Sequence, residues 1–354
     1  MTSKIVLAML AVIIFATHAA AQAPMAQIGA TTLQPGFEIT TAFHNFDKRD
    51  GEAYTRVLNA DTLRFLVNYT NTLGTVSRRE ILRGDRQNAK AYVIGFSKQM
   101  PLVMPGTTSV GLSANVFQEL KKTGQANWGL MIDTSGKILP GRLSLVKKTR
   151  YRIVINNKVA DIPALHAKGF FKAGKTQAIG EFYIVDGIHN PLMLRYNIKL
   201  GGQNIRSARD NRPIVMNVVR LNTGLSQRAT LEQTLRTMRR FELYGIHFNF
   251  ASASLRPGVR SLVADIAATL KNNPAWRLSI QGHTDSIGGA NANQLLSQRR
   301  AQAIKTALIR THKIKSGRLK VVGFGLTRPK ATNDTLEGRA MNRRVELVRL
   351  DNAN

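Results

Sequence analysis

Hydrophobic and polar residues alternate along much of the chain between about residues 37 and 221. The clearest run places an apolar side chain at every second position, at Leu192, Leu194, Tyr196, Ile198 and Leu200. A period of two is typical of a β-strand with one buried face. The pattern recurs at 151–155, directly before Asn156-Asn157, a pair that favours a tight turn. Five or six such strands, with one helix-like stretch at 114–122, predict a β-rich domain.

The pattern changes after about residue 230. Leu231, Leu235 and Met238 follow helical spacing, which predicts a short amphipathic helix. A second helix is expected to begin at Pro257, which suits the first turn of a helix. The remaining expected elements are a helix at 293–310 and strands at 244–250, 276–280, 319–324 and 343–350. Strands that alternate with helices predict a compact α+β sandwich.

These patterns divide the 354 residues into five parts. We predict a signal peptide at 1–21, a flexible segment at 22–36, a β-rich domain of unknown role at 37–225, a linker helix at 226–240 and an α+β domain at 241–354. The fold class is therefore α+β. For the β-rich domain a soluble, sandwich-like structure is expected. An outer-membrane β-barrel is the structural alternative, because barrel strands give only weak signals in a sequence.

The first residues resemble a cleavable export signal. Lys4 precedes an unbroken apolar run at 5–16, and small residues end in Ala19-Ala20-Ala21. The run is too short to span a bilayer as a helix, so we expect a mature chain that begins at Gln22. The sequence contains no cysteine, which excludes disulfides, thiol nucleophiles and a lipid-modified amino-terminal Cys. The expected location is the periplasm or the outer-membrane-associated cell envelope.

The formal net charge is +30, and residues 241–354 contribute 18 basic and 7 acidic side chains to it. Such an excess attracts polyanions. For an exported chain these are teichoic acid, anionic glycan and lipid head groups, and nucleic acid is not an expected partner. The charge is equally compatible with a role in solubility alone.

Three separated motifs lie in the last third of the chain. They are Gly282-His283-Thr284-Asp285, Leu296-Ser297-Gln298-Arg299-Arg300-Ala301 and Gly338-Arg339-Ala340-Met341-Asn342-Arg343-Arg344-Val345-Glu346. In order and spacing, with fifteen residues from Asp285 to Arg300, they resemble the OmpA-like peptidoglycan-binding domain family. The resemblance implies that 241–354 is an OmpA-like β/α sandwich. It also implies non-covalent binding of the diaminopimelate in the peptide stem of peptidoglycan.

The residues themselves support a binding site. Asp285 follows an expected strand, and on the next helix Asn293, Ser297 and Arg300 share one face because they lie four and seven residues apart. A carboxylate suits the ammonium of diaminopimelate, and a guanidinium can bind its carboxylate with two parallel hydrogen bonds. Two structural alternatives stay open here: an ion pair between Asp285 and Arg300, or Asp285 as a helix N-cap.

The resemblance adds Thr284, Asn293 and Arg343 as flanking contacts. It also points to the first strand of the domain, where many members of the family carry two acidic residues. This chain has Phe248-Asn249-Phe250-Ala251-Ser252 there. Asn249 can still donate and accept hydrogen bonds, so it is included as a ligand-binding residue, whereas Ala251 cannot.

No catalytic motif accompanies these residues. The seven histidines are scattered without metal-ligand spacing, and no nucleophile elbow is present. We therefore expect no enzymatic activity, no cofactor and no metal, and a role in tethering the outer membrane or another envelope component to the cell wall. The alternative is an enzyme acting on the cell wall or on polysaccharide, with the last domain as its anchor. Outer-membrane or other envelope components are further expected partners.

Overall fold

The computed structural model describes residues 34–44, 50–61, 64–95, 101–186, 191–201, 213–244 and 257–350. The expected signal peptide, most of the segment at 22–36, and Asn249 lie outside this range. The chain forms two compact units that divide between Thr223 and Gly224, with Thr72–Gly74 grouped with the second. None of the helices in the described part of the chain has the length and apolar character that a membrane span requires. The α+β fold class is confirmed.

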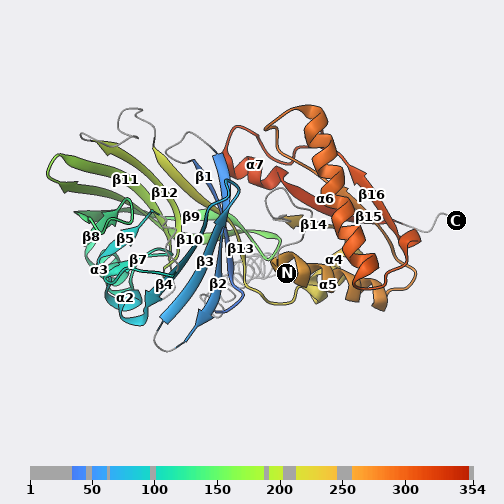
Figure 1. Cartoon of the computed structure of the whole chain (residues 1–354), viewed down its shortest axis with the longest axis horizontal. Helices are drawn as coiled ribbons and strands as arrows, with labels where there is room; N and C mark the ends of the chain where they lie inside the picture. The colour runs from blue at the N-terminus through green and yellow to red at the C-terminus, as the bar shows by residue number, and fades with distance from the viewer. Residues whose placement is uncertain are drawn as a thin grey trace, which may run out of the picture. The chain divides into compact units, whose positions relative to one another are not determined.

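The first unit is built on one large sheet. Its strands are β1 (Glu38–His44), β2 (Asp50–Ala60), β3 (Arg64–Asn71), β4 (Val76–Leu82), β5 (Ala91–Val93), β6 (Leu102–Val103), β7 (Thr107–Thr108), β8 (Gln125–Met131), β9 (Leu139–Ile155), β10 (Lys158–Ala173), β11 (Thr176–Val185), β12 (Met193–Gly201) and β13 (Ile214–Asn222). Their order in the sheet is β6-β4-β3-β2-β1-β13-β12-β11-β10-β9-β8-β5-β7 (Figure 1). The expectation of five or six strands was wrong. Strands of two or three residues show no periodicity, and longer strands such as β1 and β2 do not bury every second residue.

Local sequence explains the longest hairpin. Asn156 and Asn157 have φ of 48° and 64° and form the two-residue turn between β9 and β10. Asparagine tolerates this left-handed region better than most residues, and the turn sets the register of the strands. The predicted strand at 192–200 is confirmed as β12, and its alternating apolar residues are all buried.

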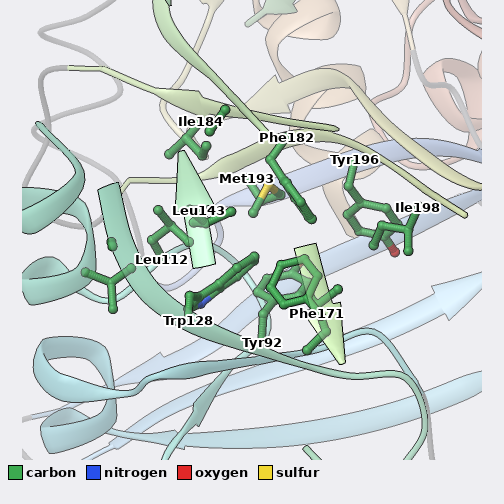
Figure 2. Close-up of a cluster of buried hydrophobic side chains, with 14 of the residues drawn as sticks. Tyr92, Leu112, Trp128, Leu143, Phe171, Phe182, Ile184, Met193, Tyr196 and Ile198 are labelled. Carbon is green, nitrogen blue, oxygen red and sulfur yellow. The ribbon is translucent and has the colours of Figure 1, made fainter. Parts of the chain in front are cut away.

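The sheet folds back on itself, because β13 also pairs in parallel with β9 at Arg220↔Val154 and Leu221↔Ile155. Two hydrophobic cores result. In one of them the ring of Trp128 meets Phe182 edge to face, with ring centroids 5.3 Å apart (Figure 2). The prediction of a β-rich, sandwich-like unit is thus confirmed, with one folded sheet instead of two separate ones.

Two helices cover part of this sheet, α2 (Arg83–Asn88) and α3 (Ala114–Thr123). The second confirms the helix expected at 114–122. Its N-cap Ser113 accepts a hydrogen bond from the backbone N–H of Val116, and Gly124 ends it at φ 76°. Both signals are standard at helix ends.

A buried ion pair crosses the first unit from β13 to β2. The guanidinium of Arg220 lies 3.2 Å from the Glu52 carboxylate, and both side chains are less than a tenth exposed. The Tyr54 hydroxyl donates a further hydrogen bond to Glu52, at 2.8 Å. Removal of one partner would leave a charge in a low-dielectric interior.

The second unit holds a four-stranded sheet in the order β14-β17-β15-β16, in which only the β15–β16 pair is parallel. Its elements are α4 (Arg228–Thr237), β14 (Arg240–Tyr244), α5 (Pro257–Asn272), β15 (Arg277–Gly282), α6 (Ala290–Arg310), η1 (Ser316–Arg318), β16 (Leu319–Gly323), α7 (Leu336–Asn342) and β17 (Arg344–Leu350). Most agree with the predicted ranges. The strand β14 covers 240–244. The strand expected at 244–250 lies outside the described residues except for Tyr244.

The helix α4 packs into the hydrophobic core of this second unit. Its Leu231 and Leu235 are fully buried there, together with residues of the sheet and of α5 and α6. Met238 had been expected on the same face, but it follows the last turn of the helix and is 73% exposed. The prediction for Met238 was wrong because the helix ends one residue too early to carry it inward.

Candidate functional site

Two glycines allow α6 to lie close against the ends of β15 and β16. A Cβ atom at Gly282 would lie 2.1 Å from the carbonyl oxygen of Ser297, and one at Gly323 would lie 2.6 Å from the Ser297 hydroxyl. Only a residue without a side chain permits this approach. The Ser297 hydroxyl in turn accepts a hydrogen bond from the Gly325 N–H, at 2.9 Å. The helix and the strand ends therefore form one rigid support (Figure 1).

Asp285 lies in the loop that leads from β15 to α6. Its Oδ1 accepts the backbone N–H of Ile287 at 3.1 Å, and its Oδ2 forms an ion pair with the guanidinium of Arg343. The Asp285 side chain is 10% exposed. In the described part of the chain Asp285 pairs with Arg343, and the N-cap of α6 is Gly289, so neither structural alternative for Asp285 is seen there. A carboxylate held this way keeps oxygen lone pairs for a further donor.

The flanking residues fix the same loop. The Asn293 amide donates to the carbonyl oxygen of Ile287 at 3.0 Å and lies near that of Gly288 at 3.4 Å. The Thr284 N–H donates to the Gly325 carbonyl at 2.9 Å. The hydroxyl oxygen of Thr284 is buried and makes no hydrogen bond in the described part of the chain. Asp285, Arg343, Thr284 and Asn293 are thus brought together at the carboxyl end of β15.

Arg300 lies on α6, seven residues after Asn293 and so on the same face. Its side chain is partly buried, including the Nε atom. Asn249, the remaining predicted site residue, lies outside the described residues.

Asn333 connects the loop to α7, a role that sequence patterns did not indicate. Its side-chain oxygen accepts hydrogen bonds from the Ser286 N–H at 3.2 Å and from the Asn342 amide at 2.9 Å. Asn342 also accepts the backbone N–H groups of Lys330 and Ala331. These contacts let Asn342 hold the chain at 330–331 against α7. An asparagine that acts on other backbone segments leaves no periodic signal, so only its position relative to the motifs could have indicated the role of Asn333.

Behind this loop lies a buried group of charged and aromatic residues. Arg344 donates two hydrogen bonds to Glu346, at 2.9 and 2.7 Å, so this buried pair is structural. The ring of His283 is 1% exposed and stacks on Phe324 with centroids 5.3 Å apart. Burial, aided by the neighbouring Arg344, lowers the pKa of His283 to about 4. The imidazole is therefore neutral at pH 7.

The low pKa of His283 predicts that the second unit loses stability in mild acid. Unfolding returns the imidazole to its ordinary pKa near 6.5, so between pH 6.5 and 4 the unfolded state binds more protons and stability falls as the pH falls. From pH 7 to 5 this group should lower the free energy of unfolding by about 2 kcal/mol. The measurement is denaturant unfolding at both pH values in the parent chain and in His283→Phe. An equal loss in the two proteins would contradict the assignment.

The comparisons with known proteins agree with this geometry. The model of the OmpA family matches residues 247–343. Over 101 residues the chain is 39% identical to "Outer membrane porin F" of Pseudomonas aeruginosa. The match covers 28% of this chain and 29% of that protein. Over 103 residues it is 39% identical to "Probable lipoprotein YiaD" of Escherichia coli. That match covers 29% of this chain and 47% of the relative.

A third relative is "Peptidoglycan-binding protein ArfA" of Mycobacterium tuberculosis, 38% identical over 103 residues that cover 29% of this chain and 31% of that protein. The chain thus matches less than half the length of each of these relatives. The family match begins at residue 247, so the β-rich unit lies outside it. Residues 247–343 are an OmpA-family domain.

Proposed function

We propose that the second unit binds peptidoglycan without catalysis, and that the chain tethers an envelope component or the outer membrane to the cell wall. The observation that carries this proposal is the fixed carboxylate of Asp285, with Arg343, Thr284 and Asn293 around it. The same segment matches the OmpA family, and one relative bears the name of a peptidoglycan-binding protein.

The proposed ligand is the diaminopimelate of the peptide stem. This amino acid presents an ammonium next to a carboxylate at the end of its side chain. The Asp285 carboxylate receives the ammonium, and the Arg300 guanidinium binds the carboxylate through two parallel hydrogen bonds. Arg343 pairs with the Asp285 carboxylate and orients it, and Asn293 holds the loop. The resemblance adds Asn249 as a further polar contact.

The location follows from the same proposal. Peptidoglycan lies outside the cytoplasmic membrane, and the sequence before Gln22 has the pattern of a cleavable export signal. Two of the three relatives carry names that refer to the outer membrane or to a lipoprotein. We infer a periplasmic or outer-membrane-associated protein. An intact-mass measurement of the protein from native envelopes, which should begin at Gln22, tests this inference.

Sedimentation with purified peptidoglycan tests the binding itself. The full chain should sediment with walls that contain diaminopimelate, and free diaminopimelate should release it. Cadaverine (1,5-diaminopentane) is the matched control, because it keeps the ammonium groups and the carbon chain between them but has no carboxylate for Arg300 to bind. Should 0.5 M salt abolish sedimentation while diaminopimelate has no effect, attraction of the +30 chain to a polyanion would explain the result instead.

A further inference from the structure

A cavity of about 430 Å³ lies within the first unit, far in sequence from the motifs described above. Strands β1 to β5 line it together with β12, β13 and nearby loops. Its volume falls within the range of roughly 300–1,000 Å³ that is usual for small-molecule sites. Phe43, Ile214 and Met216 give part of the wall an apolar character, and the rest includes polar side chains. Space of this size and composition is suited to an amphipathic molecule.

The cavity wall contains a buried positive charge, Arg79. This side chain is 7% exposed. Its guanidinium donates to the carbonyl oxygens of Gly95 at 2.7 Å and Val93 at 3.4 Å. In the described part of the chain no carboxylate lies within 4 Å of it, and the Asp133 carboxylate that also borders the cavity accepts hydrogen bonds from Ser135 instead. Burial lowers the pKa of Arg79 to about 10, so the group stays charged at pH 7.

Three tyrosines border the same cavity, Tyr69, Tyr92 and Tyr196. Tyr92 and Tyr196 are buried, with ring centroids 6.3 Å apart, and within the described ranges their hydroxyls make no hydrogen bond. Burial raises the pKa of all three phenols, that of Tyr69 to about 12. The hydroxyls therefore remain protonated and can donate. Both Tyr92 and Tyr196 lie close enough to Arg79 to affect its pKa.

We propose that this cavity binds a small amphipathic acid, with its anionic head against Arg79 and the phenols of Tyr92 and Tyr196, and its apolar body along Phe43 and Met216. A buried guanidinium without a carboxylate partner is unfavourable unless a bound anion pairs with its charge. The phenols of Tyr92 and Tyr196 are hydrogen-bond donors, which suit an anionic oxygen. A cationic ligand would meet repulsion there, and a neutral one would leave the charge uncompensated.

Isothermal titration of the full chain with three probes tests the proposal. Octanoate and octyl phosphate carry an anionic head, and octan-1-ol offers the same apolar body without charge. At least one of the two anions should bind about ten- to a hundredfold more tightly than octan-1-ol, the usual effect of charge-assisted hydrogen bonds. Their relative affinities show whether the head is a carboxylate or a phosphate. Equal binding of the alcohol and both anions, or no binding of any probe, would overturn the proposal.

Variants locate the binding in the cavity. Arg79→Met should reduce the affinity for the anion about ten- to a hundredfold and leave binding of octan-1-ol unchanged. Tyr196→Phe removes only a hydroxyl and keeps the packing, and it should reduce the affinity for the anion about two- to tenfold. This second variant keeps the proposal testable if Arg79→Met does not fold. Lys175→Gln removes an equal charge from an exposed turn and should have no effect. Unchanged anion binding in Tyr196→Phe and in folded Arg79→Met would refute the assignment.

The test is independent of the function proposed for the second unit. Arg79 and Tyr196 belong to the first unit, whereas Asp285 and Arg300 belong to the second. Sedimentation with peptidoglycan should therefore be unchanged in the Arg79 and Tyr196 variants. Failure of the cavity proposal would leave that sedimentation intact, and failure of the peptidoglycan proposal would leave binding of the amphipathic anion intact.

Discussion

Asp285→Ala and Arg300→Ala are each expected to reduce the affinity for peptidoglycan about ten- to a hundredfold. Each change removes a charge-assisted hydrogen bond of roughly 1.5–3 kcal/mol and leaves the opposite charge of the ligand without a partner. Asp285→Ala also removes the carboxylate that pairs with Arg343. Sedimentation with purified peptidoglycan over a range of wall concentrations measures the loss, and near-ultraviolet circular dichroism checks that the fold is kept.

The conservative change Arg300→Lys separates recognition from charge. Lysine keeps the positive charge but lacks the planar fork that matches a carboxylate, so the affinity should fall nearly as far as in Arg300→Ala. Lys315→Gln serves as the matched control, because it removes one charge from an exposed position of the same unit. A silent Arg300→Lys, together with equal small losses in every charge-removing variant, would show that binding is attraction by net charge alone.

Arg220→Met is expected to destabilise the first unit by about 3–5 kcal/mol. The change leaves the buried Glu52 carboxylate without the guanidinium that lies 3.2 Å from it. The double variant Arg220→Met with Glu52→Leu removes both charges and should recover most of the loss. Thermal unfolding followed by circular dichroism, with denaturant titration for the free energies, measures both effects.

An exposed ion pair of the same unit provides the comparison. Arg152 and Asp161 lie 2.9 Å apart, but their side chains are 76% and 38% exposed. Arg152→Met should therefore change the stability far less than Arg220→Met, because solvent already screens an exposed ion pair. If both single variants destabilised the unit equally, burial of the Arg220–Glu52 pair would not be the source of its effect.

The sequence predicted the second unit more fully than the first. Strand and helix periods located β15, α5 and α6, and spaced motifs indicated Asp285 and its neighbours. The short helix α7 was not predicted, because Gly338 and Asn342 give it no helical pattern. The contact between Asp285 and Arg343 joins residues 58 positions apart. Such a contact depends on how the chain returns to the sheet, which periodicity does not reveal.

The cavity around Arg79 was not predicted for a related reason. Its residues come from strands dispersed between positions 41 and 216, and no short motif connects them. In the sequence Arg79 stands between Arg78 and Glu80, and three consecutive charged residues are typical of an exposed segment. Its burial follows from pairing among strands that are distant in sequence. Long-range pairing decides which face of a strand is covered, so a local pattern could not identify the site.

The pairing of β1 with β13 has a consequence for how the first unit folds. Glu38 is opposite Asn222, so the strands that come first and last in the sequence of this unit are neighbours in the sheet. The parallel contact of β9 with β13 also depends on the end of this segment. Because a protein is synthesised from its amino terminus, the sheet cannot be completed until residue 222 has been made. High contact order of this kind slows folding and exposes unpaired strand edges for longer. The first unit therefore depends on protection from aggregation until its synthesis is complete.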